Sequence, residues 1–385
     1  MTEAKPIKIF ICAGEPSGDL HAGALMGALK RTLGRPVAFR GFGGDLMRRE
    51  GAELLYHTDQ VALIGITPIL MNLPFLLRVM GEMKGEIRRW KPDLVITVDY
   101  PGMNLRLAKF AHGLGIPAVH YICPQVWAWH RGRIPKMARM MDQLLCIFPF
   151  EPALFKGTGL DVRFTGHPLV DRAAETRAEP EVRLPWGEGH RIALLPGSRS
   201  TEITRILPRL LLAAVLLEKR MGEPCTFLIP SPSTRMRALA EEVVARSPVR
   251  PSRLDFVDGH ARQILMQAEA AAVTSGTATL EAALMRCPTV LVYLASKVTG
   301  WVARLLVKGV RFLGLANIIA DRSVMPELLQ EDFTPEKLAA ILEGYLKDPE
   351  IRAKTLGDLD EVIRLLGDGR ASERAADAIV STFLR

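Results

Sequence analysis

Short, continuously apolar runs that alternate with helical sequence constrain the fold of this 385-residue chain more than any other feature. Runs of this kind are typical of strands that are buried on both faces of a parallel sheet and covered by helices. They occur at residues 7–12, 93–99, 118–123 and 143–148 in the first half, and at 192–196, 225–230, 253–259, 270–275 and 289–294 in the second. The pattern predicts an α/β protein with two doubly wound parallel sheets, one after the other, facing a cleft.

A polar, proline-containing stretch at residues 173–190 separates the two halves. The chain is too long for one ordinary core, since domains average roughly 150 residues. We expect a first Rossmann-like domain at 1–175 and a second at 188–347. Residues 348–385 should form C-terminal helices that return to the first domain or pack on a partner subunit, which leaves a homodimer open.

The five cysteines are scattered and odd in number, and no Cys-x-x-Cys pair occurs. They predict reduced, mostly buried thiols in a cytoplasmic protein, and neither a disulfide framework nor a zinc site. The first residues enter a strand-like run without a long apolar signal region, so we do not expect export.

A formal net charge of +8 permits contact with nucleic acid, anionic lipid or phosphorylated substrates. Several basic clusters lie beside apolar stretches, among them Arg88, Arg89 and Lys91. This placement favours a lipid surface over nucleic acid as a partner, although any one cluster is equally compatible with a solvated charged face.

One apolar segment, at residues 60–80, breaks the alternation of strands and helices. Its first eighteen residues carry no charge, but they include Gly65, Pro68, Asn72 and Pro74. A membrane-spanning helix needs about 20 predominantly apolar residues, so a span is not expected. The segment is either a membrane-proximal element, such as a lid over an acyl-chain groove, or part of the buried core.

The stretch "IALLPGSRSTEITR" passes from an apolar run through a turn of small residues into a helix. Free backbone N–H groups in such a turn, together with the Arg199 guanidinium, would form a pocket for phosphate. A second turn of this kind, "VTSGTATLE", follows the run at 270–275. One such turn is as easily a plain strand-to-helix connection, but two in one half suggest a nucleoside diphosphate. Neither turn is a Walker loop or a dinucleotide fingerprint.

Polar residues that follow the first-half strands are candidates for the chemistry, because ligands bind beyond the carboxyl ends of parallel strands. Asp99 ends a buried run and could act as a general base, since burial and a nearby carboxylate raise an aspartate pKa. A helix cap or a turn residue is the other explanation for Asp99. Further candidates follow the runs at 7–12, 93–99 and 118–123: Glu15, Ser17, Gly18, His21, Asn104, Gln125, Trp127 and Arg131.

Signals for a metal are poor. The sequence has no His-Glu-x-x-His, and its Asp-x-Asp pair, Asp358 and Asp360, lies in helical sequence far from a strand end. We expect that pair to lie on a solvated face, and we expect no metal and no cofactor.

In combination and order, eight motifs make the chain resemble the lipid-A-disaccharide synthase family, whose members are two-domain GT-B glycosyltransferases. The resemblance runs almost end to end through "AGEPSGDLH", "VDYPGMN", "VWAWHRGR", "FPFEPALF", "FTGHPLVD", "LLPGSR", "TSGTATLEAAL" and "MPELLQ". Three positions depart from the family pattern: Pro68 replaces a glutamate, Ala316 replaces a proline, and Gln125 stands where serine is common.

The resemblance implies transfer of 2,3-diacylglucosamine from its UDP-linked form to 2,3-diacylglucosamine 1-phosphate (lipid X), which releases UDP and forms a β(1→6) disaccharide with inversion. It implies a peripheral association with the inner membrane, and no nucleic acid, metal or cofactor. A different UDP-sugar enzyme, such as a peptidoglycan-precursor transferase or an epimerase, and a non-catalytic lipid-binding or nucleic-acid-binding protein are the alternatives.

Under this resemblance, Asp99 is the base, with Glu15 as competitor, and Arg199 is the catalytic clamp on the leaving diphosphate. Glu281 would bind the ribose hydroxyls. The full UDP-binding set is Gly197, Ser198, Arg199, Ser275, Gly276, Thr277, Thr279, Glu281 and Asn317. The acceptor and sugar set is Ser17, Gly18, His21, Asn104, Gln125, Trp127 and Arg131.

Overall fold

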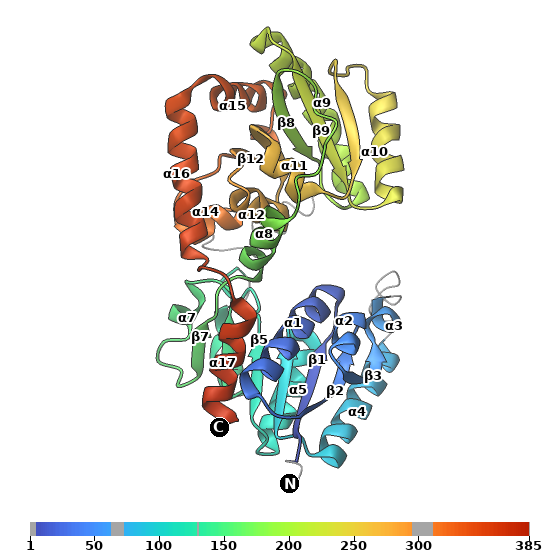
Figure 1. Cartoon of the computed structure of the whole chain (residues 1–385), viewed down its shortest axis with the longest axis vertical. Coiled ribbons are helices and arrows are strands. Elements are labelled where there is room, and N and C mark those ends of the chain that lie inside the picture. The colour runs from blue at the N-terminus through green and yellow to red at the C-terminus, as the bar shows by residue number, and fades with distance from the viewer. Residues whose placement is uncertain (1–4, 63–72, 129–130, 295–310, 385) are drawn as a thin grey trace. The chain divides into compact units, whose positions relative to one another are not determined.

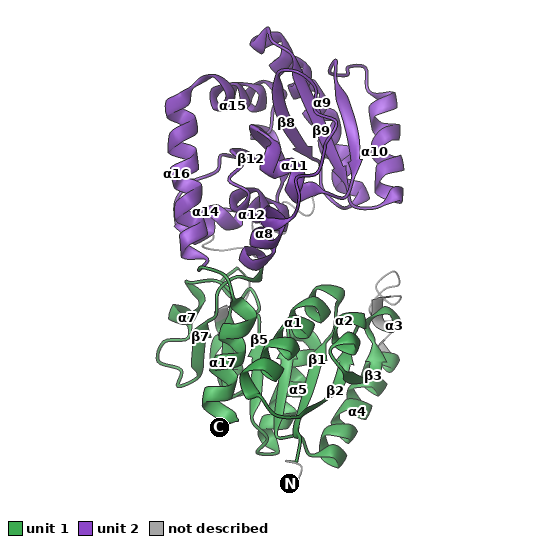
Figure 2. Cartoon of the chain, in the orientation of Figure 1, with its two compact units in different colours: residues 1–168, 368–385 green, residues 169–367 purple. Residues whose placement is uncertain are grey.

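A computed structural model describes residues 5–62, 73–128, 131–294 and 311–384 of the chain. The chain divides into two compact units, residues 1–168 with 368–385 and residues 169–367 (Figure 2). The middle of the apolar segment expected at 60–80, including Pro68, lies outside the described residues. None of the helices in the described ranges combines the length and apolar character that crossing a bilayer requires.

The unit boundaries differ from the expected domains at two places. Residues 169–175 belong to the second unit, because their helix is tied to it by the Gln263 amide, which donates to the Thr176 carbonyl at 3.2 Å. Residues 348–367 also stay with the second unit, where Asp358 pairs with Arg322 at 2.8 Å and Asp360 with Arg286 at 2.7 Å. The Asp-x-Asp pair is therefore engaged in ion pairs and does not lie on a purely solvated face.

The first unit is built on a parallel sheet whose described strands follow the order β3-β2-β1-β4-β5-β6-β7. The four central runs predicted from the sequence form β1, β4, β5 and β6. The strands are β1 (Ile7–Ala13), β2 (Val37–Gly43), β3 (Ala52–His57), β4 (Leu94–Val98), β5 (Ala118–Tyr121), β6 (Gln143–Cys146) and β7 (Asp161–Phe164).

Helices cover both faces of this sheet (Figure 1), as a parallel sheet with continuously apolar strands requires. The helices are α1 (Pro16–Leu33), α2 (Asp45–Arg49), α3 (Thr58–Ala62), α4 (Leu73–Trp90), α5 (Pro101–Gly113), α6 (Ile134–Met137), α7 (Glu151–Leu154) and α17 (Ala371–Phe383), with a 3-10 turn η3 (Arg131–Arg133).

The C-terminal helix α17 packs on α1, the first helix of the chain (Figure 1). Arg31 of α1 pairs with Glu373 of α17 at 2.9 Å, and the Thr32 hydroxyl donates to Asp377 at 3.3 Å. The inner face of α17 is buried at Ala375 and Ile379. The last helix therefore completes the first unit.

The second unit repeats the design with strand order β10-β9-β8-β11-β12-β13, all parallel in the described residues. Its strands are β8 (His190–Leu195), β9 (Cys225–Ser231), β10 (Leu254–Asp258), β11 (Ala270–Thr274), β12 (Thr289–Tyr293) and β13 (Glu327–Leu329). Its helices are α8 (Pro168–Ala178), α9 (Ser200–Met221), α10 (Thr234–Arg246), α11 (Ala261–Gln267), α12 (Thr277–Leu284), α14 (Leu315–Ala320), α15 (Pro335–Lys347) and α16 (Pro349–Leu365), with a 3-10 turn η4 (Gln330–Asp332).

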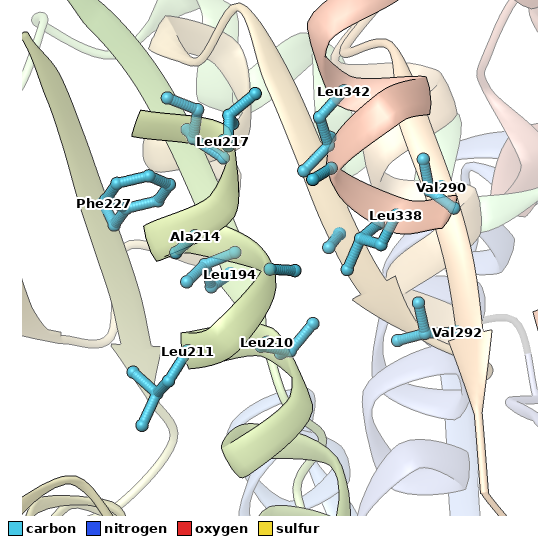
Figure 3. Close-up of a cluster of buried hydrophobic side chains, with 14 of the residues drawn as sticks. Leu194, Leu210, Leu211, Ala214, Leu217, Phe227, Val290, Val292, Leu338 and Leu342 are labelled. Carbon is cyan, nitrogen blue, oxygen red and sulfur yellow. The ribbon is translucent and has the colours of Figure 1, made fainter. Parts of the chain in front are cut away.

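The core of the second unit fixes the helix that follows β8. Helix α9 buries one face against the sheet and against α15, as Leu210 and Leu338 illustrate in Figure 3. Fully burying a side chain of this size contributes about 1.5–3 kcal/mol. Because α9 is held along its length, the turn that joins it to β8 has a fixed position beside the ends of the neighbouring strands.

Candidate functional site

A cavity of about 660 Å³ lies in the second unit, lined by the turns that follow β8, β9, β10 and β11. It brings together seven of the nine residues that the sequence suggests for nucleotide binding: Gly197, Ser198, Arg199, Ser275, Gly276, Thr277 and Glu281. The cavity is where ligands bind in open parallel sheets, beyond the carboxyl ends of the strands.

The first of the two predicted anion turns already holds a carboxylate of the chain. One carboxylate oxygen of Glu202 accepts the backbone N–H groups of Ser198, at 3.0 Å, and Arg199, at 3.2 Å. The other oxygen accepts from Nη1 of Arg199 at 3.2 Å. The expectation that this turn offers free backbone donors is therefore wrong for Ser198 and Arg199, because a carboxylate one helical turn away occupies them.

The second predicted anion turn is open. Gly276 is the N-cap of α12, with a φ of 152°, and no side chain caps the helix there. The first N–H groups of an α-helix have no partner within the helix, and the helix dipole favours an anion at that end. The N–H of Ser275 is used within the sheet, since it donates to the Val292 carbonyl at 3.1 Å. The start of α12 at Gly276 and Thr277 is thus the better anion site of the two.

Glu281 lies one turn into α12, half-buried in the wall of the cavity. Burial raises the pKa of its carboxyl, while Arg262 and Arg172 act in the opposite direction. The Arg262 guanidinium lies 4.0 Å from the Glu281 carboxylate. The cavity therefore holds a carboxylate beside cations from two other helices.

Arg172, His260 and Arg262 line the cavity but are absent from the sequence-based set. His260 and Arg262 directly follow β10, so the rule that selected Asp99, polar residues after an apolar run, would also have found them. Arg172 lies on α8, and no local sequence signal connects it to the cavity.

Two of the predicted nucleotide residues have other partners. Asn317 is buried: its amide donates to the Met325 carbonyl and to Glu327, both at 2.8 Å, and its oxygen accepts from the N–H of Val324 and of Met325. Thr279 is also buried, and its hydroxyl donates to the Gly276 carbonyl at 2.8 Å. Neither residue lines the cavity, so both support the local backbone.

In the first unit, Asp99 and Tyr100 form a left-handed turn directly after β4, with φ values of 50° and 46°. The N–H of Asp99 donates to the Tyr121 carbonyl at 3.0 Å, which fixes the turn to β5. Gly14 makes room for the turn, because a Cβ at Gly14 would lie 2.3 Å from the Tyr100 ring. Non-glycine residues adopt this conformation at a cost, and such residues cluster at functional sites.

The charge of Asp99 acts on the Glu15 carboxyl. Burial raises the pKa of Asp99, with a smaller opposing effect from the Tyr100 backbone. Partial burial also raises the pKa of Glu15, and the charge of Asp99 raises it further. Asp99 is half-buried and Glu15, the N-cap of α1, is exposed. Two carboxyls with raised pKa values therefore lie at neighbouring strand ends.

Asn104 has a positioning role in this turn. It is buried, and its amide nitrogen lies 2.8 Å from the Asp99 carbonyl, 2.9 Å from the Val98 carbonyl and 3.2 Å from the Cys12 carbonyl. These contacts tie the ends of β1 and β4 together. They favour a structural role for Asn104 over the sugar contact expected from the sequence.

The other acceptor candidates occupy different environments. Ser17 is exposed and His21 half-buried on α1, whereas Gly18 is buried where α1 approaches β4, and a Cβ at Gly18 would lie 3.5 Å from the Val98 carbonyl. Gln125 is exposed. Trp127 is 8% exposed and meets Phe148 and Phe150 edge to face, so its ring belongs to the core. Arg131 begins η3, and its side chain lies outside the described residues, as do Trp129 and His130.

All five cysteines are free and buried, as predicted. Within the described ranges, one group of three potential metal ligands occurs: Cys123, Cys146 and Glu151 lie within 4.8 Å of one another. Burial raises the pKa of Glu151 to about 8, and its carboxyl accepts the Phe148 N–H at 3.1 Å. Through this hydrogen bond Glu151 supports the loop after β6.

Known proteins resemble this chain both in sequence and in fold. A family model described as lipid-A-disaccharide synthetase matches residues 9–380. The lipid-A-disaccharide synthase of Koribacter versatilis is 38% identical over an alignment of 386 positions, which covers 98% of each chain.

Among solved structures, the UDP-GlcNAc 2-epimerase from Neisseria meningitidis, bound to UDP-GlcNAc, superposes with a TM-score of 0.61 at 10% identity, covering 98% of this chain and 100% of that one. MurG of Acinetobacter baumannii gives 0.59 at 14% identity, with coverage of 98% and 100%. At these identities the likeness concerns the fold, and it confirms the predicted GT-B class. The match of the family model over nearly the whole length shows that the chain belongs to the lipid-A-disaccharide synthase family, UDP-sugar glycosyltransferases that form the lipid A disaccharide from UDP-diacylglucosamine and lipid X.

Proposed function

We propose that the cavity of the second unit binds the UDP part of the donor and that Asp99 of the first unit activates the acceptor, lipid X. One observation carries the donor half of the proposal: the uncapped start of α12, Arg199 and Glu281 line one cavity. This set offers backbone donors and a cation to a diphosphate, and a carboxylate to ribose hydroxyls.

The diphosphate is assigned to the start of α12, at Gly276 and Thr277, with the Arg199 guanidinium as its counter-charge. Gly197 and Ser198 form the adjacent wall, and Ser275 shapes the turn. A fixed cation and a helix dipole stabilise negative charge most where that charge increases during the reaction. The leaving UDP gains such charge as the glycosidic bond breaks.

The acceptor reaction is assigned to Asp99. Its carboxylate takes the proton from the 6-hydroxyl of the acceptor while that oxygen forms a bond to the anomeric carbon of the donor. The bond from the anomeric carbon to the diphosphate oxygen breaks, and its electron pair leaves with UDP. A single displacement of this kind inverts the anomeric configuration. Glu15 is the alternative base, because its carboxyl lies within the electrostatic influence of Asp99.

Substrate choice tests the proposal. We expect UDP release with UDP-2,3-diacylglucosamine and lipid X, and little release with plain UDP-N-acetylglucosamine. Activity with the unacylated sugar alone would favour an epimerase or a peptidoglycan-precursor transferase instead. Absence of UDP release with every donor would favour a lipid-binding protein without catalysis.

We also propose peripheral attachment to an anionic lipid surface through α4 of the first unit. Leu77 is 57% exposed there, next to the exposed Arg78, whereas Leu76 packs on the core. An apolar side chain beside basic residues suits the interface of a bilayer.

A homodimer stays a prediction of the sequence, which light scattering of the purified chain would test.

A further inference from the structure

Glu202 makes the most extensive polar contacts at the candidate donor site, yet the proposed reaction gives it no task. It is the third residue of α9, whose N-cap is Arg199. Its carboxylate accepts two backbone N–H groups of the turn before the helix and one guanidinium nitrogen. In a common helix cap the glutamate satisfies the backbone alone. Here it also holds the side chain that is assigned to the diphosphate.

The two partners differ sharply in exposure. The Glu202 side chain is 13% exposed, whereas that of Arg199 is 79% exposed. The carboxylate is therefore the fixed member of the pair, and the guanidinium is the member that reaches toward the cavity. Within the described part of the chain, the Arg199 guanidinium donates a hydrogen bond through Nη1 alone. The other N–H groups of the guanidinium are therefore available to a ligand.

The turn is shaped around the Glu202 side chain. Gly197 has a φ of 109°, and a Cβ at that position would lie 2.4 Å from a carboxylate oxygen of Glu202 and 2.7 Å from its Cβ. A glycine is needed at Gly197 both for this backbone conformation and for the close approach of Glu202. The sequence Gly197 to Glu202 thus forms one packed unit.

We propose that Glu202 is a positioning residue for the donor: it stays in place when the donor binds and holds the Arg199 guanidinium at the mouth of the cavity. The inference rests on the proposed donor site. If Glu202 moved away, two backbone N–H groups would lose their acceptor and the space beside Gly197 would be left empty. A bound arginine whose free donors are already oriented loses less conformational freedom when it meets an anion.

The proposal predicts a result opposite to the one expected from charge alone. Removing a negative charge near a diphosphate should tighten UDP binding if Glu202 merely repels or competes with it. If Glu202 positions Arg199, the Glu202→Gln variant should bind UDP roughly tenfold more weakly, because a charge-assisted hydrogen bond is lost. The KM for the donor should rise more than kcat falls, and the KM for lipid X should not change.

The test measures UDP binding calorimetrically in the full chain with Glu202→Gln, Arg199→Ala and the double variant. We expect Glu202→Gln to weaken binding in the wild-type background and to have little further effect once Arg199 is replaced. Thr334→Ala is the control for a lost helix cap, since the Thr334 hydroxyl accepts the Lys337 N–H at the start of α15, away from the cavity. It should lower Tm without altering the Kd for UDP.

Four outcomes would overturn the inference. Tighter UDP binding by Glu202→Gln would make Glu202 a competitor of the diphosphate. An equal effect with and without Arg199 would reduce Glu202 to a helix cap. If Arg199→Ala weakens UDP binding but Glu202→Gln does not, the inference fails and the donor site stands. If Arg199→Ala itself leaves UDP binding unchanged, the donor site fails and the inference fails with it.

Discussion

At the carboxyl end of its sheet the first unit places two carboxyls with raised pKa values, whereas the second places an open helix end and exposed or half-buried cations. Both ends come from the same parallel-sheet design, and both contain glycine turns between strand and helix. The difference lies in the chemistry of the side chains. The carboxyls of the first site are suited to accept a proton, whereas the helix end and the cations of the second site are suited to hold an anion. The same architecture therefore serves two chemical tasks through a few residues after each strand.

Asp99→Asn should produce the largest effect. Losing a general base lowers turnover by a factor on the order of 100 to 10,000, while UDP affinity should be retained because the donor cavity is untouched. Steady-state kinetics and calorimetry with UDP would measure the two quantities. Asp59→Asn, an exposed carboxyl in the same unit, is the matched control and should retain turnover.

Thermal unfolding of Asp99→Asn separates function from structure. A carboxyl whose pKa is raised by burial binds its proton more tightly in the folded state, so its ionisation costs stability as the pH rises through the folded pKa. The variant should therefore be no less stable than the wild type at neutral pH. Near-normal turnover in Asp99→Asn would transfer the role of base to Glu15.

Arg199→Ala should follow in size. We expect a loss of roughly 3 kcal/mol in transition-state stabilisation, about a hundredfold in kcat/KM, because the leaving diphosphate loses its counter-charge. Arg205→Ala, an exposed arginine on the same helix, is the control. Equal losses in both variants, or a loss confined to Tm, would mean that the second unit holds anions without Arg199.

The pH dependence of kcat/KM should report the ionisation of Asp99. Catalysis needs ionised Asp99, and its pKa is raised, so kcat/KM should fall about tenfold per unit below an acid limb that lies above the usual range of an aspartate. Measuring the profile from pH 4 to pH 8 with saturating acceptor would place that limb. An acid limb within the ordinary aspartate range would contradict a buried base.

Glu281→Gln should have a smaller effect on the second site. Losing a charged acceptor for ribose hydroxyls should weaken UDP binding roughly tenfold. Binding of pyrophosphate, which has no ribose, should weaken less. Pyrophosphate competition in calorimetry distinguishes the two. Equal weakening of UDP and pyrophosphate would show that Glu281 acts on the cations Arg262 and Arg172 instead of on the ribose.

Leu77→Ser should give the smallest change, because one interfacial leucine contributes about 1.5–3 kcal/mol at most when fully buried. We expect binding to anionic liposomes to weaken severalfold with unchanged turnover on dispersed substrate. Leu114→Ser, another exposed leucine of the same unit, is the control. Equal binding by wild type and Leu77→Ser would mean that α4 does not contact the membrane.

Much of the fold was predictable, since the apolar runs mark the central strands of both sheets. The strands that were not predicted are β2, whose sequence contains Arg40 and two glycines, and the edge strands β3, β7 and β13, which are short or only partly buried. An edge strand faces solvent on one side, which weakens the continuous apolar signal.

The candidate site was predictable where a local turn defines it, as at Arg199 and Gly276. Asn104 and Asn317 share the same signal, a polar residue near a strand end, but their partners are backbone carbonyls and amides that only the folded chain brings near. The role of Glu202 could not be predicted, because in the sequence it is an ordinary residue of the first helical turn. Its contacts with Ser198 and Arg199 appear only in the folded chain.

Helix α17 makes the first unit discontinuous in the chain, with a long insertion between residues 168 and 368. During synthesis, the face of α1 that α17 covers stays uncovered until residues 371–383 have been made. Truncation after residue 367 should therefore damage the first unit, which lies at the opposite end of the sequence, and leave the second unit with its helices complete. The packing of α1 therefore depends on a helix that is synthesised only after the whole of the second unit.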